Sequence, residues 1–154
     1  MKEEFQGQCT GEIRFEELKI EDYQEIYDLW SKTPGVRLSK ADSYDNIQRF
    51  LLRNEGMSFV CRYGDKIIAT ILCGHDGRRG FIYNLAVEEG YRRWGIGGTL
   101  VEKCLQKLKE VGIDKCHIFV YLKNEPGNAF WSAKGWMKRD DLFVYTKSLD
   151  EGAL

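Results

Sequence analysis

The sequence predicts a single domain of mixed α/β class, with strands and amphipathic helices alternating along the chain. Three observations support this. Some segments alternate apolar and polar residues, as half-buried strands do. Others repeat apolar residues every three or four positions, as helices do. Turns rich in glycine separate the two kinds of segment. With 154 residues, 43% of them hydrophobic, the chain is long enough for one core and short for two. The expected domain is residues 1–154, with polar ends at about 1–10 and 149–154.

The N-terminal third is expected to form one strand and two helices. Residues 11–18 alternate apolar and polar side chains, which predicts a strand. Residues 20–32 place their apolar side chains on one helical face. A proline and a glycine then break the pattern, and Asp42 or Ser43 is expected to cap a second helix over residues 44–54.

Three further strands are predicted in the middle of the chain. Residues 57–63, 65–74 and 81–89 are rich in β-branched and aromatic side chains. The Gly-Asp pair at 64–65 is typical of a hairpin turn, and residues 75–80 supply another turn. These strands should therefore form an antiparallel meander.

The C-terminal third is expected to contain two helices and three strands. A helix follows the glycines near residue 97 and ends at Gly112. Residues 115–122 predict a strand, 124–135 a short helix, and 136–149 two strand-like pieces. The complete order is β-α-α-β-β-β-α-β-α-β-β, and the helix after the glycines is a crossover.

Composition excludes several classes of function. The chain has 23 basic and 24 acidic residues, so its formal charge of -1 gives no field that attracts nucleic acid or an anionic membrane. Five cysteines without a C-x-x-C pair predict reduced thiols and no metal site. The N-terminus is polar and no apolar run is long enough to span a membrane. We therefore expect a cytoplasmic protein.

The segment YRRWGIGGTL, residues 91–100, is the strongest functional signal. A helix start has backbone N–H groups without partners and the positive end of the helix dipole. Glycines let a large anion approach the backbone, and Arg92 and Arg93 add positive charge. The pattern indicates a pyrophosphate site, although a glycine-rich turn that only closes helix against strand remains an alternative.

Two common nucleotide motifs fit this segment poorly. A P-loop requires Lys and then Ser or Thr after its last glycine, and Gly95 is followed by Ile96. A dinucleotide fingerprint requires Gly or Ala at the position of Leu100 and an acid at the end of the next strand, and neither is present. An ordinary nucleotide binder is therefore the least favoured interpretation.

A third motif matches. Arg92-x-x-Gly95-x-Gly97, after the strand YNLAV and before an amphipathic helix, resembles the acetyl-coenzyme A signature of the GNAT superfamily of N-acetyltransferases. The segment NEPGNAFWSAKGW is similar in spacing to a second GNAT motif. The resemblance extends from about residue 12 to residue 148. It implies a twisted, mostly antiparallel sheet of about seven strands with helices on both faces.

The resemblance also implies how acetyl-coenzyme A would bind. The backbone of Leu85, Ala86 and Val87 would bond the pantetheine and polarise the thioester carbonyl. Asn124 matches a position that contacts the pantetheine, and Trp131 falls in the second motif. The pyrophosphate would lie against Arg92, Arg93, Trp94, Gly95, Ile96, Gly97, Gly98 and Thr99.

The resemblance leaves the proton donor open. The tyrosine that commonly protonates the leaving thiolate in the superfamily is replaced by Trp131, whose indole is no workable acid. Tyr121 and Tyr83 are substitutes, each of which could instead be a packed aromatic. The thiolate could also leave without a protein acid, since thiols are acidic enough.

The general base is equally open. Asp76 lies in the turn before the strand YNLAV, beside His75, and Glu125 follows Asn124. Asn84 could hold a water that acts as the base. An Asp-Gly pair such as the one at residue 76 is also common in turns for purely conformational reasons.

The acceptor is expected to be a primary amine of a small molecule or peptide, with acceptor contacts from residues 31–43 and 137–142. Arg37 and Lys40 could bind a carboxylate, and Asp42 or Asp141 an ammonium, although solvated loop charges are the simpler explanation. The alternative function is a catalytically silent module that binds coenzyme A as a sensor. A homodimer is compatible with either function.

Overall fold

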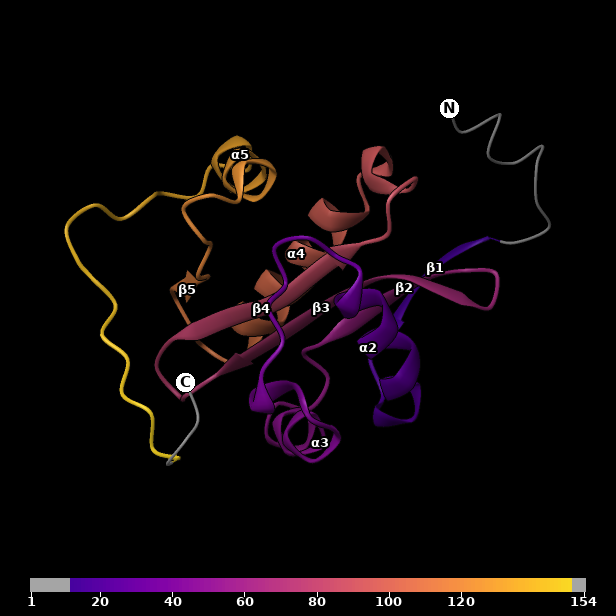
Figure 1. The fold of residues 1–154 in the computed structure, drawn as a ribbon, viewed down its shortest axis with the longest axis horizontal. Coiled ribbons are helices and arrows are strands. Elements are labelled where there is room, and N and C mark those ends of the chain that lie inside the picture. The colour runs from indigo at the N-terminus through magenta and orange to yellow at the C-terminus, as the bar shows by residue number, and fades with distance from the viewer. Residues whose placement is uncertain (1–11, 151–154) are drawn as a thin grey trace. The chain divides into compact units, whose positions relative to one another are not determined.

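The computed structural model describes residues 12–150, and the chain divides into two compact units. The first unit ends at Tyr121 and the second begins at Leu122. Figure 1 shows the elements of both units along the chain.

The first unit is built on a five-stranded sheet in the order β1-β2-β3-β4-β5. Strands β1 to β4 are antiparallel neighbours, and β5 is parallel to β4. The parallel pair requires a crossover, and α4 supplies it, as the sequence predicted. The strands are β1 (Ile13–Glu17), β2 (Phe59–Tyr63), β3 (Lys66–His75), β4 (Gly80–Val87) and β5 (Cys116–His117).

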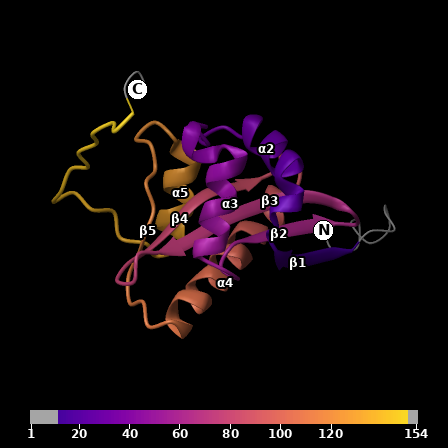
Figure 2. The same cartoon turned by 90° about the horizontal axis from the view of Figure 1, so that it is seen from below.

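Helices cover both faces of this sheet, as Figure 2 shows. Helices α2 (Tyr23–Ser31) and α3 (Tyr44–Arg53) lie on one face, and α4 (Ile96–Glu110) lies on the other. Three short 3-10 helices join the main elements: η1 (Ile20–Asp22), η2 (Lys40–Asp42) and η3 (Arg92–Trp94).

The core between the sheet and the first pair of helices is made by the apolar faces that the sequence predicted. Ile26, Leu29 and Trp30 of α2 and Ile47 of α3 are buried against side chains of β2, β3 and β4. Each such side chain contributes about 1.5–3 kcal/mol by leaving water. This packing fixes the position of the loop between α2 and α3 over the sheet.

The opposite face of the sheet packs against α4. Leu100, Cys104 and Leu108 of that helix are buried. At Gly80 a Cβ atom would lie 2.6 Å from Leu108, so a side chain at this position would push the helix away. Close packing here fixes the C-terminal part of α4 against the start of β4.

Serine side chains cap the two helical segments that follow α2, which are η2 and α3. Ser43, rather than Asp42, caps α3, and its Oγ accepts the N–H of Asn46 at 3.2 Å. Asp42 instead ends η2 and completes a capping box with Ser39. Of the two predicted caps, the structure therefore selects Ser43 and gives Asp42 a different role.

The second unit contains α5 (Glu125–Ala133). Asn124 caps this helix by accepting the N–H of Gly127 at 3.1 Å. Trp131 is buried and packs edge-on against Trp136, with ring centroids 4.6 Å apart. Its indole therefore contributes to the packing of this unit.

The strand count differs from the expected seven, because the described residues contain five strands. The strand predicted over residues 115–122 is reduced to Cys116–His117, and residues 136–149 form no strand. Phe143 and Tyr145 in that segment are exposed. An alternating pattern predicts which residues can form a strand, but the strand itself requires a partner that local sequence does not specify.

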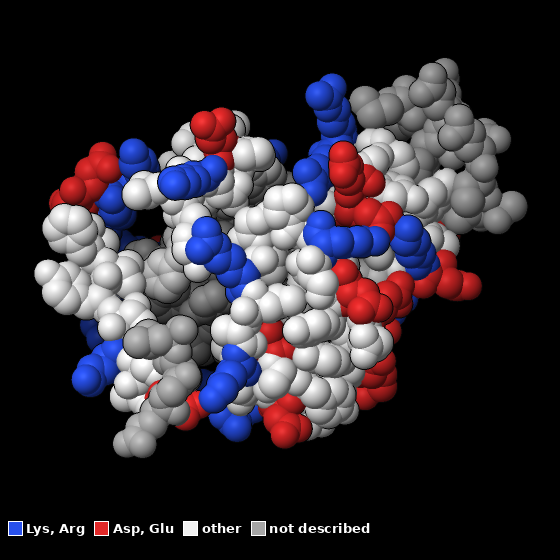
Figure 3. Space-filling view, in the orientation of Figure 1, with Lys and Arg blue, Asp and Glu red and all other residues white. Residues whose placement is uncertain are grey.

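On the face drawn in Figure 3, acidic and basic side chains are interspersed and neither sign covers the surface. Within residues 12–150, no helix has the length and apolar character needed to cross a membrane.

Candidate functional site

One edge of β4 is free over most of its length. Strand β5 pairs with β4 only at Gly80 and Phe81, opposite Cys116 and His117. Among the described residues, no strand pairs with that edge from Ile82 to Val87. Backbone N–H and C=O groups that point to this edge are therefore available to an extended ligand, except the carbonyl of Val87, which accepts the Nε–H of Arg92.

A β-bulge interrupts β4 in the middle of this free stretch. Thr70 of β3 pairs with Ala86 and Leu72 pairs with Tyr83, so Ile71 faces two residues of β4, Asn84 and Leu85. Asn84 has a φ of 48°, and it is the only non-glycine residue with a positive φ between residues 12 and 150. Such a bulge redirects the strand and the amides that follow it.

Beyond β4, a glycine turn leads into α4. Gly95 adopts the left-handed conformation with a φ of 75° and occupies the N-cap position of α4. The first helical bond is donated by the N–H of Thr99 to the carbonyl of Gly95 at 3.1 Å. Within the described chain, the amides of Ile96, Gly97 and Gly98 donate to no protein oxygen, as expected of a helix start without a side-chain cap.

Two arginines lie beside these amides. Arg92 Nε donates to the carbonyl of Val87 at 3.1 Å, which ties η3 to the end of β4. Arg93 is exposed and has no hydrogen bond or ion pair with another described residue. The helix dipole, the open amides and the two guanidinium groups are the features expected of an anion site, which remains a prediction.

An ion-pair cluster anchors the start of the turn. Glu88, the residue after β4, bonds Lys66 of β3 at 2.8 Å and Lys32 at 2.9 Å. Burial raises the pKa of the Glu88 carboxyl, but the hydrogen bonds and charges of both lysines outweigh burial, so its pKa lies below the ordinary value.

An aromatic cluster anchors the rest of the turn. Tyr91 and Trp94 pack edge-on with ring centroids 4.7 Å apart, and Tyr63 of β2 contacts both. Trp94, predicted as a cofactor residue, therefore also holds η3 against the sheet. Rigid anchoring of this kind keeps the anion site in one geometry before a ligand arrives.

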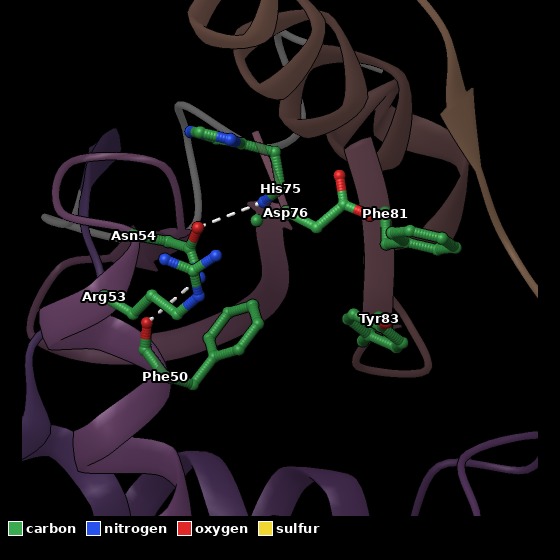
Figure 4. A pocket seen from close by; sticks show the side chains of 8 residues that line it. Phe50, Arg53, Asn54, His75, Asp76, Phe81 and Tyr83 are labelled. Atoms are coloured by element: carbon green, nitrogen blue, oxygen red, sulfur yellow. Dashed lines mark hydrogen bonds between the residues drawn. The ribbon is translucent and has the colours of Figure 1, made fainter. Parts of the chain in front are cut away.

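Tyr83, one candidate acid, lines a pocket of about 230 Å³ between α3 and β4. Figure 4 shows Phe50 and Arg53 of α3 and the following residue, Asn54, on one side and Phe81 and Tyr83 of β4 on the other. Burial and, to a smaller extent, the Cys116 thiol raise the pKa of Tyr83. Its hydroxyl thus stays protonated at neutral pH, as a proton donor requires, although it is a weaker acid than a free tyrosine.

Asp76, one candidate base, also lines the pocket, but its carboxylate is engaged in its own turn. Its Oδ1 accepts the N–H groups of Arg78 and Arg79, both at 2.8 Å. These two bonds lower the pKa of Asp76, which makes the carboxylate a weaker base. The geometry thus matches the conformational role that an Asp-Gly turn has without any catalysis.

Tyr121, the other candidate acid, lies in the first unit after β5. The guanidinium of Arg37 stacks on its ring, 3.8 Å from the centroid. A cation at this distance from an aromatic face is attracted to it. The contact joins the loop after α2, where acceptor contacts are expected, to the segment that follows β5.

The remaining predicted site residues, Asn124, Glu125 and Trp131, lie in the second unit at α5. Asn124 is the N-cap and Glu125 is the first helical residue. The cap function of Asn124, weighed from the sequence as an alternative, is present. Their roles toward a cofactor or acceptor stay predictions.

The described cysteines have no features of nucleophiles. Cys61, Cys73 and Cys104 are buried and Cys116 is half-buried, and all four are free. Burial raises the pKa of Cys61 to about 11, and burial together with Cys73 raises that of Cys116 to about 12. Cys9 lies outside the described residues. Within residues 12–150, no cluster of His, Cys, Asp or Glu could hold a metal ion.

Comparison with known families identifies this arrangement. The acetyltransferase (GNAT) family model matches residues 23–136, which include β4, the glycine turn and α4. The chain belongs to the GNAT acetyltransferase family. GNAT acetyltransferases use acetyl-coenzyme A as the acetyl donor. The anion site at the start of α4 and the free edge of β4 fit the pyrophosphate and the extended arm of this cofactor.

Individual relatives agree with this assignment. An acetyltransferase of Sodalis glossinidius is 26% identical over 131 residues, which cover 85% of this chain and 92% of the relative. A GNAT-family acetyltransferase of Staphylococcus aureus has a similar structure, with a TM-score of 0.74, 21% identity and coverage of 90% and 94%. The PaiA N-acetyltransferase of Thermoplasma acidophilum, solved with coenzyme A, has a TM-score of 0.68, 18% identity and coverage of 80% and 88%.

The structure of this GNAT acetyltransferase also reveals contacts that the sequence did not predict. Asn84 Nδ2 donates to Asp42 Oδ1 at 2.8 Å, and Thr70 Oγ1 donates to the carbonyl of Asn84 at 3.0 Å. The residue type of Asn84 is the one sequence signal for the bulge, because asparagine tolerates a positive φ better than most residues. The partners of Asn84 lie 14 and 42 positions away, so no local pattern identifies them.

Proposed function

We propose that this protein transfers the acetyl group of acetyl-coenzyme A to a primary amine of a small molecule or peptide, by direct attack in a ternary complex. The observation that carries the proposal is the row of open amides at the start of α4. They lie beside Arg92 and Arg93 and directly follow a strand with a free edge. Membership of the GNAT acetyltransferase family supports acetyl transfer, and the amine is the finer part of the proposal.

The donor side of the site follows from these residues. Arg92, Arg93 and the open amides of Ile96, Gly97 and Gly98 would hold the pyrophosphate, and the backbone of residues 85–87 would bond the pantetheine arm. The amide of Thr99, which the sequence placed in this site, donates to the carbonyl of Gly95 instead. Acetyl-coenzyme A supplies an activated acetyl group. A preorganised backbone N–H aimed at the carbonyl oxygen as negative charge develops there is worth about 2.7–4 kcal/mol. At residues 85–87 this role belongs to the backbone and not to the side chains.

The structure limits the choice of the acid and the base less than it limits the choice of cofactor-binding residues. Two observations support Tyr83 as the acid. Its hydroxyl is protonated at neutral pH, and the residue lies one position before the bulge. Tyr121 is the second candidate. For the base, the lowered pKa of Asp76 favours a water held near Asn84 or the carboxylate of Glu125. A thiolate of coenzyme A could also leave without a protein acid.

A second function is favoured by one observation. Trp131 stands at the position where the superfamily commonly has its acidic tyrosine, and its indole is buried against Trp136. A chain that retains the cofactor site and lacks this acid could bind coenzyme A as a silent sensor or partner module.

Release of free thiol from acetyl-coenzyme A, measured over a panel of primary amines, separates the two functions. The proposal predicts amine-dependent thiol release with at least one acceptor and a matching N-acetylated product by mass spectrometry. Tight binding of coenzyme A with no turnover on any amine would favour the silent module instead.

We also propose a cytoplasmic location, because the four described cysteines are free thiols and cytosolic conditions keep thiols reduced.

A further inference from the structure

The bulge residue Asn84 is held on its backbone side by a buried hydrogen-bond chain. Its carbonyl accepts the hydroxyl of Thr70 at 3.0 Å, and Thr70 Oγ1 in turn accepts the indole N–H of Trp30 at 2.8 Å. Thr70 and Trp30 are fully buried. Because the hydroxyl has one proton, the bond from Trp30 directs that proton toward Asn84.

A carboxylate holds the same residue on its side-chain side. Asn84 Nδ2 donates to Asp42 Oδ1 at 2.8 Å, across 42 positions of sequence. Asp42 is only 8% exposed, which is unusual for an acid. Its Oδ2 accepts the N–H of Ser39 at 3.0 Å, and its carbonyl accepts the hydroxyl of Tyr23 at 2.6 Å. These contacts fix the direction in which the carboxylate points.

The cap at η2 does not by itself explain this arrangement. The capping box needs only Oδ2 of Asp42, which leaves Oδ1 without a role in the turn. That oxygen instead bonds the one non-glycine residue with a positive φ between residues 12 and 150. A non-glycine residue with a positive φ is strained, and it keeps this backbone conformation where the surrounding structure holds it there.

We infer that Asp42 is a positioning residue for acetyl transfer, which acts by holding Asn84 and thereby the bulge of β4 in one geometry. The bulge sets the direction of the amides of Leu85 and Ala86, so the loop after α2 and the thioester site are mechanically linked. This inference rests on the proposed function. It differs from a role for Asp42 in binding the ammonium of an acceptor, because Asp42 would touch no substrate.

A double-mutant cycle tests this inference. Asp42→Ala removes the carboxylate, and Asn84→Gly removes the side chain while tolerating the positive φ. We expect each single variant to lower kcat on the order of tenfold, since small misplacements of reacting groups have large effects on rate. The KM for the amine should stay within about twofold. Because Asp42 acts through Asn84, the double variant should be no slower than the slower single variant.

Two further variants serve as controls. Asp42→Asn keeps an oxygen that can accept from Asn84 and should recover part of the lost kcat. Asp45→Ala removes an exposed acid three residues further on and should leave kcat unchanged. Effects of Asp42→Ala and Asn84→Gly that multiply, or a raised amine KM at unchanged kcat, would overturn the inference and assign Asp42 to acceptor binding.

One readout does not depend on activity. In the wild-type protein, the side-chain amide protons of Asn84 should exchange slowly with solvent by nuclear magnetic resonance, and in Asp42→Ala they should exchange rapidly. If no amine is acetylated, the proposed function fails while this measurement still decides the role of Asp42. Unchanged exchange in Asp42→Ala would show that Asp42 does not hold Asn84.

Discussion

At the scale of single residues, Gly97 carries the most specific expectation about the cofactor. It lies at the second position of α4, is buried, and has an amide that donates to no described protein oxygen. We expect Gly97→Glu to abolish coenzyme A binding, because it places a side chain and a negative charge where phosphate should lie. Like charges in contact oppose binding by several kcal/mol, so calorimetry should show at least about a 100-fold loss of affinity.

A matched variant controls for charge and for folding. Gln106→Glu adds the same charge to an exposed position of the same helix, and it should bind coenzyme A like the wild type. A folded Gly97→Glu protein with unchanged affinity would count against placing the pyrophosphate at α4.

Trp131 is the residue at which this chain departs from the superfamily pattern. We expect Trp131→Tyr to leave turnover equal or to raise it, because the change introduces a phenolic hydroxyl where the superfamily commonly has its acid. The measurement is kcat for the best amine of the panel. Trp136→Tyr alters the same aromatic pair without a hydroxyl at position 131, and it should not raise turnover. A large loss in Trp131→Tyr alone would reveal a role for the indole itself.

At the scale of elements, Glu88 joins the end of β4 to β3 and to the residue after α2. Glu88→Gln should lower the free energy of unfolding at pH 7 by about 1 kcal/mol, because partly exposed ion pairs contribute only fractions of a kcal/mol each. Glu89→Gln is the control, since Glu89 is exposed and forms no ion pair with another described residue.

The pH dependence of this effect has a definite sign. The pKa of Glu88 is lowered in the folded protein, so its contribution is complete above the unfolded value of about 4.3 and is lost as pH falls through the folded value. Denaturant unfolding should therefore show a difference between wild type and Glu88→Gln that shrinks from pH 7 to about pH 3. A difference that persists in acid would mean that the lysine contacts do not cause it.

The same elements show what local sequence can predict. Apolar spacing correctly predicted α2, α3 and α4, and alternation with turn signals predicted the meander β2-β3-β4. The glycine turn was placed correctly because left-handed backbone at Gly95 needs a residue without Cβ. These features depend on neighbouring residues, which is why the sequence alone predicts them.

The structural features that the sequence predicted wrongly or did not predict depend on residues far apart in the chain. The expected strands in residues 136–149 are not present in the described chain, because a strand exists only with a partner that accepts and donates its hydrogen bonds. The contact between Asp42 and Asn84 joins a loop and a strand 42 residues apart. The sequence therefore predicted the glycine turn at the start of α4, and it did not predict the contacts that support the bulge.

At the scale of the whole molecule, ligand binding should raise thermal stability selectively. A ligand that binds only the folded state stabilises it by about 2.7 kcal/mol at a concentration of 100 times Kd. We expect coenzyme A to raise Tm in a concentration-dependent way and ATP or NAD to have little effect, as measured by scanning fluorimetry. Protection by ATP or NAD without protection by coenzyme A would favour an ordinary nucleotide binder.

A crystal structure of the protein with coenzyme A would show directly where the cofactor lies. We expect pyrophosphate oxygens within hydrogen-bond distance of the amides of Ile96, Gly97 and Gly98, with the pantetheine arm along the free edge of β4. Coenzyme A bound elsewhere, with those three amides bonded to protein oxygens, would contradict this placement.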